Sequence, residues 1–220
     1  MQFPEYLSKT FPGLDLDFNL FRAWPIALRF EVGLEHPKDS KYFETAVNRA
    51  CTLYKSAFAP SDLCFIVSDT DHLERNRRKT TYGYSSRRWP PVRNIFELCQ
   101  SHSLGLSGIS GRQRISHDEG DGEYRITTRR WTAISPRRID FRFILQALAH
   151  WDFPNRTPHI QDRIYFINRT RNVIFHMYDD RGLDIISPQV GNLLNLYETH
   201  NDWILDYNRE EINKTFSTPT

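Results

Sequence analysis

The sequence predicts an α+β fold in a single domain over residues 1–220, and three patterns carry that prediction. Apolar residues alternate along PIALRFEVGL (25–34), which is the period of a strand with one buried face. Between residues 40 and 60 they recur every three to four positions, which is the period of a helix. Three short apolar runs then follow one another across residues 163–187, which is typical of an antiparallel meander.

The N-terminal part is predicted to form a strand–helix–strand unit. The buried face of its first strand is made by alternating residues: Ile26, Leu28, Phe30, Val32 and Leu34. Asp39 or Ser40 can cap the start of the helix, and Pro60 ends it. The continuous apolar run at 62–69 is rich in β-branched and aromatic residues, which favours a central strand buried on both faces.

Two long segments without apolar periodicity are expected to be flexible loops, at about 69–92 and 103–122. The second loop holds five of the ten glycines. Between the loops, NIFELCQSHS (94–103) predicts a short helix, and EYRITTRRWTAI (123–134) predicts a half-exposed strand. Loops of this length in a compact domain are either functional or poorly ordered.

The C-terminal part is predicted to be an antiparallel three-stranded meander with packed helices. Ser135 and Pro136 have the pattern of a cap followed by the first helical residue. The meander consists of three predicted strands: 163–168, 172–178 and 183–187. A closing helix is expected at 188–200, and the spacing of Asn208 and Glu211 predicts a capping box for a last short helix.

The composition favours a cytoplasmic protein without cofactor or metal. No apolar run approaches the ~18 residues of a membrane span, and the N-terminal residues lack the apolar core of a signal peptide. The three cysteines form no C-x-x-C pair, so neither a zinc site nor a disulfide framework is indicated. Charge is segregated, because residues 72–138 hold 14 Lys or Arg against six Asp or Glu while the rest of the chain holds 15 against 21.

The acidic segment DDRG (179–182) has two interpretations. As chemistry, it could gather a hard cation or supply an acid and a base. The residues of this alternative acidic site are His176, Tyr178, Asp179, Asp180, Arg181 and Asp184. As structure, it is a hairpin loop that ends on Gly182 in the left-handed conformation. We favour the hairpin, because three carboxylates on one hairpin need further ligands to enclose a cation, and we predict no catalytic residue and no metal site.

Two other polar patterns favour structural roles. His176 alternates with apolar residues, which is typical of a partly buried histidine in a sheet. Arg29 and Glu31 share one face of the first strand, where cross-strand ion pairs are more common than a ligand-binding pair.

The basic segment 75–93 is the main candidate for binding. Its candidate residues are Arg75, Arg77, Arg78, Lys79, Arg87, Arg88 and Trp89. Such a segment can be a solvated loop, can dock on an acidic protein surface, or can hold nucleic acid through phosphate contacts and stacked bases. Of the two kinds of partner we favour a protein over nucleic acid, and the sequence identifies no small-molecule ligand.

Several short stretches resemble one family in their order along the chain: RFEVG (29–33), DFP (152–154), YFIN (165–168), HMYDDRGLDIIS (176–187) and LYETHNDWILDYNREEI (196–212). The chain resembles the bacterial domain-of-unknown-function family 3885 from about Phe18 to Ile212. The resemblance implies a soluble bacterial α+β protein with no established activity or cofactor. Some small bacterial families of this type act as toxin-neutralising partners.

The sequence therefore predicts a non-catalytic protein-binding module, with toxin neutralisation or immunity as one form of that role. The first alternative is a nucleic-acid-binding protein that uses residues 75–93. The second alternative is an enzyme with its acidic site around Asp179 to Asp184.

Overall fold

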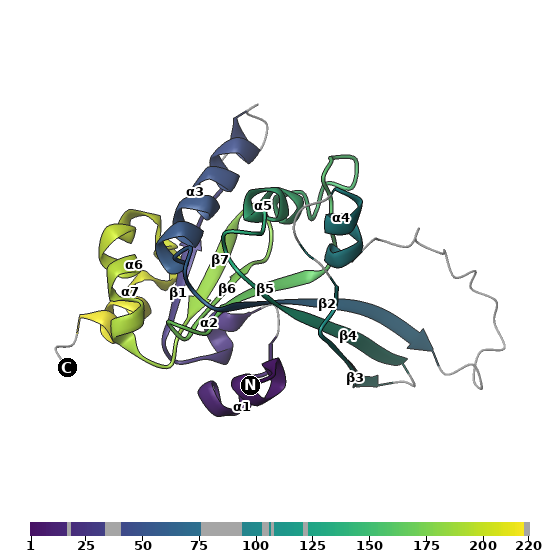
Figure 1. Cartoon of the computed structure of the whole chain (residues 1–220). Coiled ribbons are helices and arrows are strands. Elements are labelled where there is room, and N and C mark those ends of the chain that lie inside the picture. Colours follow the sequence, from purple (N-terminus) through teal and green to yellow (C-terminus); the bar gives the residue numbers. More distant parts are fainter. Residues whose placement is uncertain are drawn as a thin grey trace.

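The computed structural model describes residues 1–16, 19–33, 41–75, 94–102, 106, 108–120 and 123–217, and these residues contain one seven-stranded antiparallel sheet. The strands lie in the order β1-β7-β6-β5-β2-β4-β3 (Figure 1). Their bounds are Ala27–Glu31 (β1), Cys64–Arg75 (β2), Gly111–Gly120 (β3), Glu123–Ile134 (β4), Arg163–Asn168 (β5), Val173–Met177 (β6) and Gly182–Ile186 (β7). The sheet and its helices make this an α+β protein.

Helices cover both faces of the sheet. Their bounds are Phe3–Thr10 (α1), Leu20–Ala23 (α2), Tyr42–Ala57 (α3), Ile95–Ser101 (α4), Phe141–Ala149 (α5), Leu194–Thr199 (α6) and Asp206–Phe216 (α7), with 3-10 helices at Val190–Asn192 (η1) and Asn201–Trp203 (η2). In Figure 1, α3, α4 and α5 lie above the sheet, and α1 and α2 lie below it. None of the described helices is both long and apolar enough to cross a membrane.

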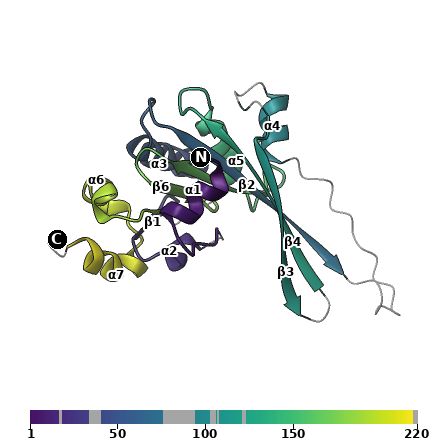
Figure 2. The same cartoon turned by 60° about the horizontal axis from the view of Figure 1, so that its bottom comes forward.

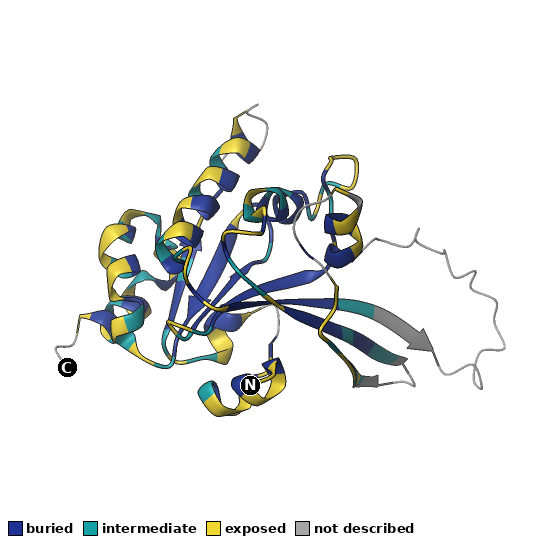
Figure 3. Cartoon of the chain, viewed as in Figure 1, coloured by how far each residue is buried: buried dark blue, intermediate teal, exposed yellow. Residues whose placement is uncertain are grey.

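The core explains why the central strands are nearly continuous apolar runs. Every residue of β5, β6 and β7 is buried, because helices or the N-terminal segment pack on both faces (Figure 3). On the upper face, the ring of Tyr54 in α3 stacks on Phe58 at 4.4 Å and on Phe141 at 4.3 Å. On the lower face, Phe3 of α1 packs against Phe65 and Trp131. Aromatic pairs of this kind add about 1 kcal/mol each beyond the area that they bury.

A three-stranded wing projects from this core (Figure 2). β2 pairs with β4 from Cys64 to Arg75, whereas β5 pairs only with the first half of β2. The far half of β2 therefore continues past the core together with β4 and with β3, the outermost strand. We call residues 70–75, 111–120 and 123–130 the wing.

The wing corrects the prediction of long loops at 69–92 and 103–122. Residues 69–75 belong to β2, and residues 111–120 form β3. The residues of β3 from Gly111 to His117 are exposed or half-buried, so polar side chains there replace the apolar alternation that would reveal a strand. The other residues of the two expected loops lie outside the described part, except for the end of α4 and a few residues before β3.

The predicted strand–helix–strand unit does not form a unit of its own. β1 lies at one edge of the sheet beside β7, whereas β2 lies between β5 and β4. The helix itself is present as α3, which ends before Pro60, and its expected caps lie outside the described residues. Sequence periodicity identifies each element but does not say which strands pair.

Three predicted helix boundaries are wrong. α5 is capped by Asp140, which accepts a hydrogen bond from the Phe143 amide at 3.0 Å, and Ser135-Pro136 belong to a turn before it. The closing segment 188–200 divides into η1 and α6. The last helix begins at Asp206, so Asn208 lies inside α7 and is buried rather than serving as its cap.

The DDRG segment is the hairpin turn between β6 and β7. The Tyr178 amide donates to the carbonyl oxygen of Gly182 at 3.3 Å, which closes the turn. Gly182 is the first residue of β7 and is not among the left-handed residues of the described chain, so the prediction of its conformation is wrong. Glycine is required because a Cβ there would overlap the Tyr178 hydroxyl and lie 2.9 Å from the Phe30 carbonyl oxygen.

Candidate functional site

A row of charged and polar side chains crosses the lower face of the sheet. Strand register places its members on the same face, one strand after another: Arg29, Asp184, His176, Tyr165, Arg163, Asp69 and Arg129. The N-terminal segment with α1 and α2 lies below the sheet (Figure 1). Buried charges are costly unless they are paired, so the pairing within this row decides what it can do.

At one end of the row, Arg29 and Asp184 form a two-pronged ion pair between β1 and β7. The Arg29 Nε donates to Oδ1 of Asp184 at 2.7 Å, and Nη2 donates to Oδ2 at 2.8 Å. Burial alone would lower the pKa of Arg29, but the hydrogen bonds and charge of Asp184 outweigh burial and raise it. The expected cross-strand ion pair is confirmed for Arg29, while Glu31 is exposed at the edge.

The same carboxylate anchors the N-terminal segment. Oδ2 of Asp184 accepts the Phe21 amide at 3.0 Å, and Arg29 also donates to Asn19 at 2.7 Å. The Asp184 side chain is fully enclosed. This carboxylate therefore joins β7, β1 and α2.

His176 lies at the centre of the row and is enclosed. Its Nδ1 lies 2.9 Å from the Ile164 carbonyl oxygen, and its ring stacks on Tyr165 with 4.5 Å between centroids. Burial lowers the pKa of His176, so the ring is neutral and Nδ1 carries the proton that the carbonyl accepts. Its Nε2 has no hydrogen-bond partner among the described residues.

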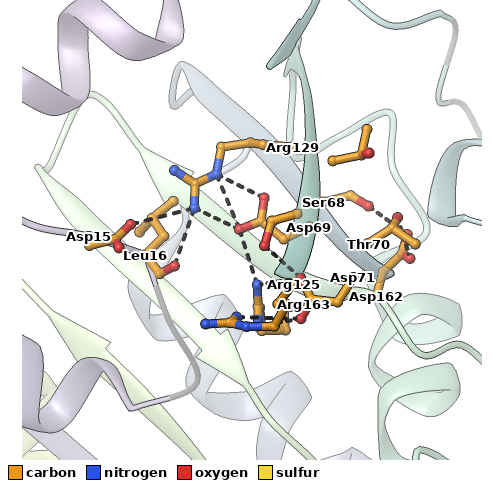
Figure 4. Close-up of polar contacts among 12 residues, drawn as sticks. Asp15, Leu16, Ser68, Asp69, Thr70, Asp71, Arg125, Arg129, Asp162 and Arg163 are labelled. Carbon is orange, nitrogen blue, oxygen red and sulfur yellow. Dashed lines mark hydrogen bonds and ion pairs between the residues drawn. The ribbon is translucent and has the colours of Figure 1, made fainter. Parts of the chain in front are cut away.

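The other end of the row is an arginine–aspartate cluster (Figure 4). The Arg129 Nε donates to Oδ1 of Asp69 at 2.8 Å, and Nη2 donates to Oδ2 at 2.7 Å. Arg163 donates to both oxygens of Asp71 at 2.8 and 3.1 Å, and the Arg125 Nη1 lies 3.7 Å from the same carboxylate. Charged pairs of this geometry fix the planes of both guanidinium groups.

A small pocket opens beside this cluster, where the wing leaves the core. Its volume is about 80 Å³. It is lined by Asp15, Leu16, His117, Arg125, Thr127, Arg129 and Arg163. The segment before α2 contributes one wall, since Arg129 donates to the Leu16 carbonyl oxygen at 3.2 Å.

Comparison with known proteins identifies one family over most of the chain. The family described as domain of unknown function (DUF3885) matches residues 3–208. The chain belongs to the DUF3885 family. A Bacillus subtilis (strain 168) relative, Uncharacterized protein YnaE, is 21% identical over 215 residues, which cover 92% of this chain and 96% of the relative. No solved structure matches the chain.

In this DUF3885 member the acidic residues of the hairpin do not gather around Asp184. Asp179 binds the Arg181 guanidinium and accepts the Arg181 amide at 2.8 Å. Asp152, Asp179 and Asp180 bring carboxylate oxygens within 4.8 Å of one another, and Arg181 also lies 3.7 Å from Asp152. Arg181 thus supplies positive charge to this group, while Asp184 faces Arg29 in the row.

Two tyrosines connect to the hairpin. Burial and a hydrogen bond to Asp180 raise the pKa of Tyr42, and burial also raises the pKa of Asp180. Burial likewise raises the pKa of Tyr178, whose ring lies 5.7 Å from the Arg29 guanidinium. These phenols are therefore neutral and act as packing and hydrogen-bonding groups.

Most of the predicted basic binding segment lies outside the described residues. This holds for Arg77, Arg78, Lys79, Arg87, Arg88 and Trp89. The backbone of Arg75 ends β2, and its side chain is outside the described part. Within the basic stretch 72–138, the described arginines include Arg112 and Arg114 on β3 and Arg125, Arg129 and Arg130 on β4.

Sequence reasoning missed the arginine–aspartate cluster. A usable signal was present, because Arg163 begins the buried run RIYFIN and Asp69 follows the buried run CFIVS. A charged residue in register with the inward positions of an apolar strand must have a partner, since an unpaired buried charge is strongly unfavourable. That signal identifies the residues but not their partners.

Proposed function

We propose that this chain is a non-catalytic protein-binding module that docks an acidic partner on the outer edge of the wing. The observation that carries the proposal is the position of β3, an outermost strand that places Arg112 directly opposite Arg130. The edge offers backbone groups, and the arginines offer charge. The backbone groups would pair with a strand of the partner, and the arginines would contact an acidic surface on it.

The backbone of β3 supports attachment by strand addition. β3 is ten residues long, and among the described residues no strand pairs with its outer edge. Arg112, Gln113 and Arg114 are exposed. An exposed edge presents N–H and C=O groups that a strand of a second protein can pair with.

The charge of the wing supports an acidic partner. Burial and the neighbouring charge of Arg112 lower the pKa of Arg130. Arg130 donates to Thr70 at 2.9 Å, and the charges of Asp162 and Glu97 only partly offset the lowering of its pKa. Like charges directly opposite each other destabilise a strand pair, so an acidic surface would relieve this repulsion and would also accelerate encounter.

The enclosed row favours binding over catalysis. His176 and Asp184 have 1% or less of their surface exposed, and Asp184 is neutralised by Arg29. A catalytic base must reach its substrate within hydrogen-bond distance. The arginines of the wing edge, Arg112 and Arg114, are exposed and can be reached by a partner.

The test is affinity purification of the full-length chain from cells of its native host. We expect a specific protein to be retained by the wild type and lost with R112E/R114E. The matched control is R137E/R138E, which makes the same change of charge at exposed arginines outside the wing. Failure of the wild type to retain any specific protein, or equal retention by both variants, contradicts the proposal.

The same experiment also tests nucleic-acid binding and toxin neutralisation. Material released by nuclease treatment would identify nucleic acid, and not protein, as the partner. A toxin-neutralising role is the narrower form of the proposal. It requires that the retained protein inhibits growth when it is expressed alone and that co-expression of this chain relieves the inhibition.

A further inference from the structure

We propose that the segment which docks on β3 is an extended acidic strand with Asp or Glu at every second position. This inference rests on the proposed function, because it concerns the same edge, and it adds the spacing and the facing of the partner's charges. β3 is the outermost strand of the wing (Figure 2). A strand that adds to such an edge lies about 4.8 Å from it, and its side chains align with those of the edge strand.

The pairing of β3 with β4 fixes which side chains of β3 share a face. Arg112 lies opposite Arg130, and Gln113 lies opposite Arg129, which belongs to the charged row of the lower face. Directly opposite residues of two strands point to the same face, and successive residues point to opposite faces. Arg112 and Arg114 therefore both lie on the upper face of the wing.

These two arginines set the spacing of the partner's acidic residues. Residues two apart in a strand are separated by about 7 Å, in β3 and in an added strand alike. The residues of the added strand that lie beside Arg112 and Arg114 are therefore also two apart. The position between them lies beside Gln113, which carries no charge and points to the other face. The edge thus favours alternating acidic residues, and not only a high negative charge.

Arg112 is the main point of attachment. Its side chain is exposed, and no carboxylate of the described chain lies within ion-pair distance of it. Its opposite neighbour is a second cation, Arg130, so a carboxylate on an added strand would reduce the repulsion between them. Arg114 is exposed as well, and a guanidinium has five N–H donors, so it can bind a carboxylate in addition to its other contacts.

The same charges disfavour two other occupants of the edge. If two copies of β3 paired in antiparallel fashion, the arginines of both copies would lie on one face, and like charges across a strand pair are destabilising. Nucleic acid carries the right charge, but it has no peptide groups that could pair with the backbone of the edge. An acidic strand supplies both the peptide groups and the charge.

The experiment measures the fluorescence anisotropy of dye-labelled peptides titrated with the full-length chain. Each peptide has about seven residues, which is the length of a short strand. In the first peptide glutamate alternates with threonine. The second peptide has the same composition with glutamate at every third position, so that successive glutamates point to opposite faces. We expect the wild type to bind the first peptide about tenfold more tightly, because only this peptide places a carboxylate beside both arginines.

Two controls test how the first peptide binds. Arg112→Gln should lower its affinity about tenfold, to that of the second peptide, whereas Arg138→Gln, at an exposed position outside the wing, should leave it unchanged. Methylation of the backbone nitrogens of the first peptide should abolish binding, because it removes the donors that pair with the edge.

Equal affinities of the wild type for the two peptides overturn the inference. Absence of saturable binding of the first peptide at about 1 mM chain overturns it as well, and so does undiminished binding of the methylated peptide. The proposed function is tested separately, by retention of a host protein and its loss with R112E/R114E. If that protein is retained but the two peptides bind equally, the chain docks a folded acidic surface and only this inference fails.

Discussion

Removing the Asp184 carboxylate should destabilise the fold far more than removing an exposed carboxylate that binds arginine in the same way. Asp184→Ala deletes two hydrogen bonds to Arg29 and one to the Phe21 amide, and it leaves the guanidinium without its counter-ion. Breaking a buried ion pair on one side costs about 3–5 kcal/mol. The Arg29 side chain is 16% exposed and therefore reaches some water. We expect Asp184→Ala to lower the free energy of unfolding by the smallest value of this range, about 3 kcal/mol.

The chain offers a matched control in Arg22 and Glu211. Glu211 also receives two hydrogen bonds from one arginine, at 3.0 and 2.9 Å, but the two side chains are 51% and 56% exposed. Glu211→Ala should therefore cost no more than about 1 kcal/mol. In the Asp184→Ala variant the Arg29 guanidinium has lost its counter-ion. Replacing this arginine as well, with Arg29→Met, should recover part of the lost free energy of unfolding.

The assay is urea denaturation followed by far-ultraviolet circular dichroism. With a slope of roughly 3 kcal/mol per molar urea, Asp184→Ala should lower the midpoint by about 1 M and Glu211→Ala by less than about 0.4 M. Equal shifts for the two variants would refute the reasoning, because burial would then make no difference to the value of the pair.

Three further predictions concern stability. Gly182→Ala should lower the free energy of unfolding by about 1–3 kcal/mol because of its overlap with backbone and ring, whereas Gly191→Ala, which meets nothing within 4 Å, should be neutral or slightly stabilising in the same urea assay. Because burial lowers the pKa of His176 from 6.5, the unfolded chain takes up the proton first, so stability should fall as the pH drops below about 6.5; His176→Gln should reduce the difference between midpoints at about pH 7.5 and about pH 5.5. Asp162 accepts the Ile95 amide at 2.9 Å, so Asp162→Ala should release α4 and accelerate amide hydrogen exchange there, while exchange in β6 should stay unchanged in the native state.

The parts of the fold that sequence could predict are those whose residues follow the local geometry. The α3 helix shows its period directly, since Phe43, Val47, Ala50 and Tyr54 are all buried on one side. The β6–β7 hairpin is visible from two apolar runs around a polar turn. β3 was not predicted because its described side chains are exposed or half-buried, so its sequence lacks the apolar alternation of a strand that covers a core.

The charged row could not be assembled from sequence, because its partners are distant along the chain. Asp69 lies 60 residues from Arg129, and Arg29 lies 155 residues from Asp184. Only strand order brings them together, and strand order depends on the whole fold. The family resemblance was confirmed because it rests on several motifs in sequence, which need no knowledge of contacts.

The two edges of the sheet differ, and this limits how copies of the chain can associate. On the β1 side, Ile204 forms a bridge with Phe30, and the Leu205 amide donates to the Arg29 carbonyl oxygen at 3.0 Å. Arg209 stabilises this segment by donating hydrogen bonds to the carbonyl oxygens of Asn201 and Ile204. A second copy that paired with β3 through its own β3 would present its β1 side outward, where residues 204 and 205 occupy the edge, so such pairing would favour a closed pair over an open-ended polymer.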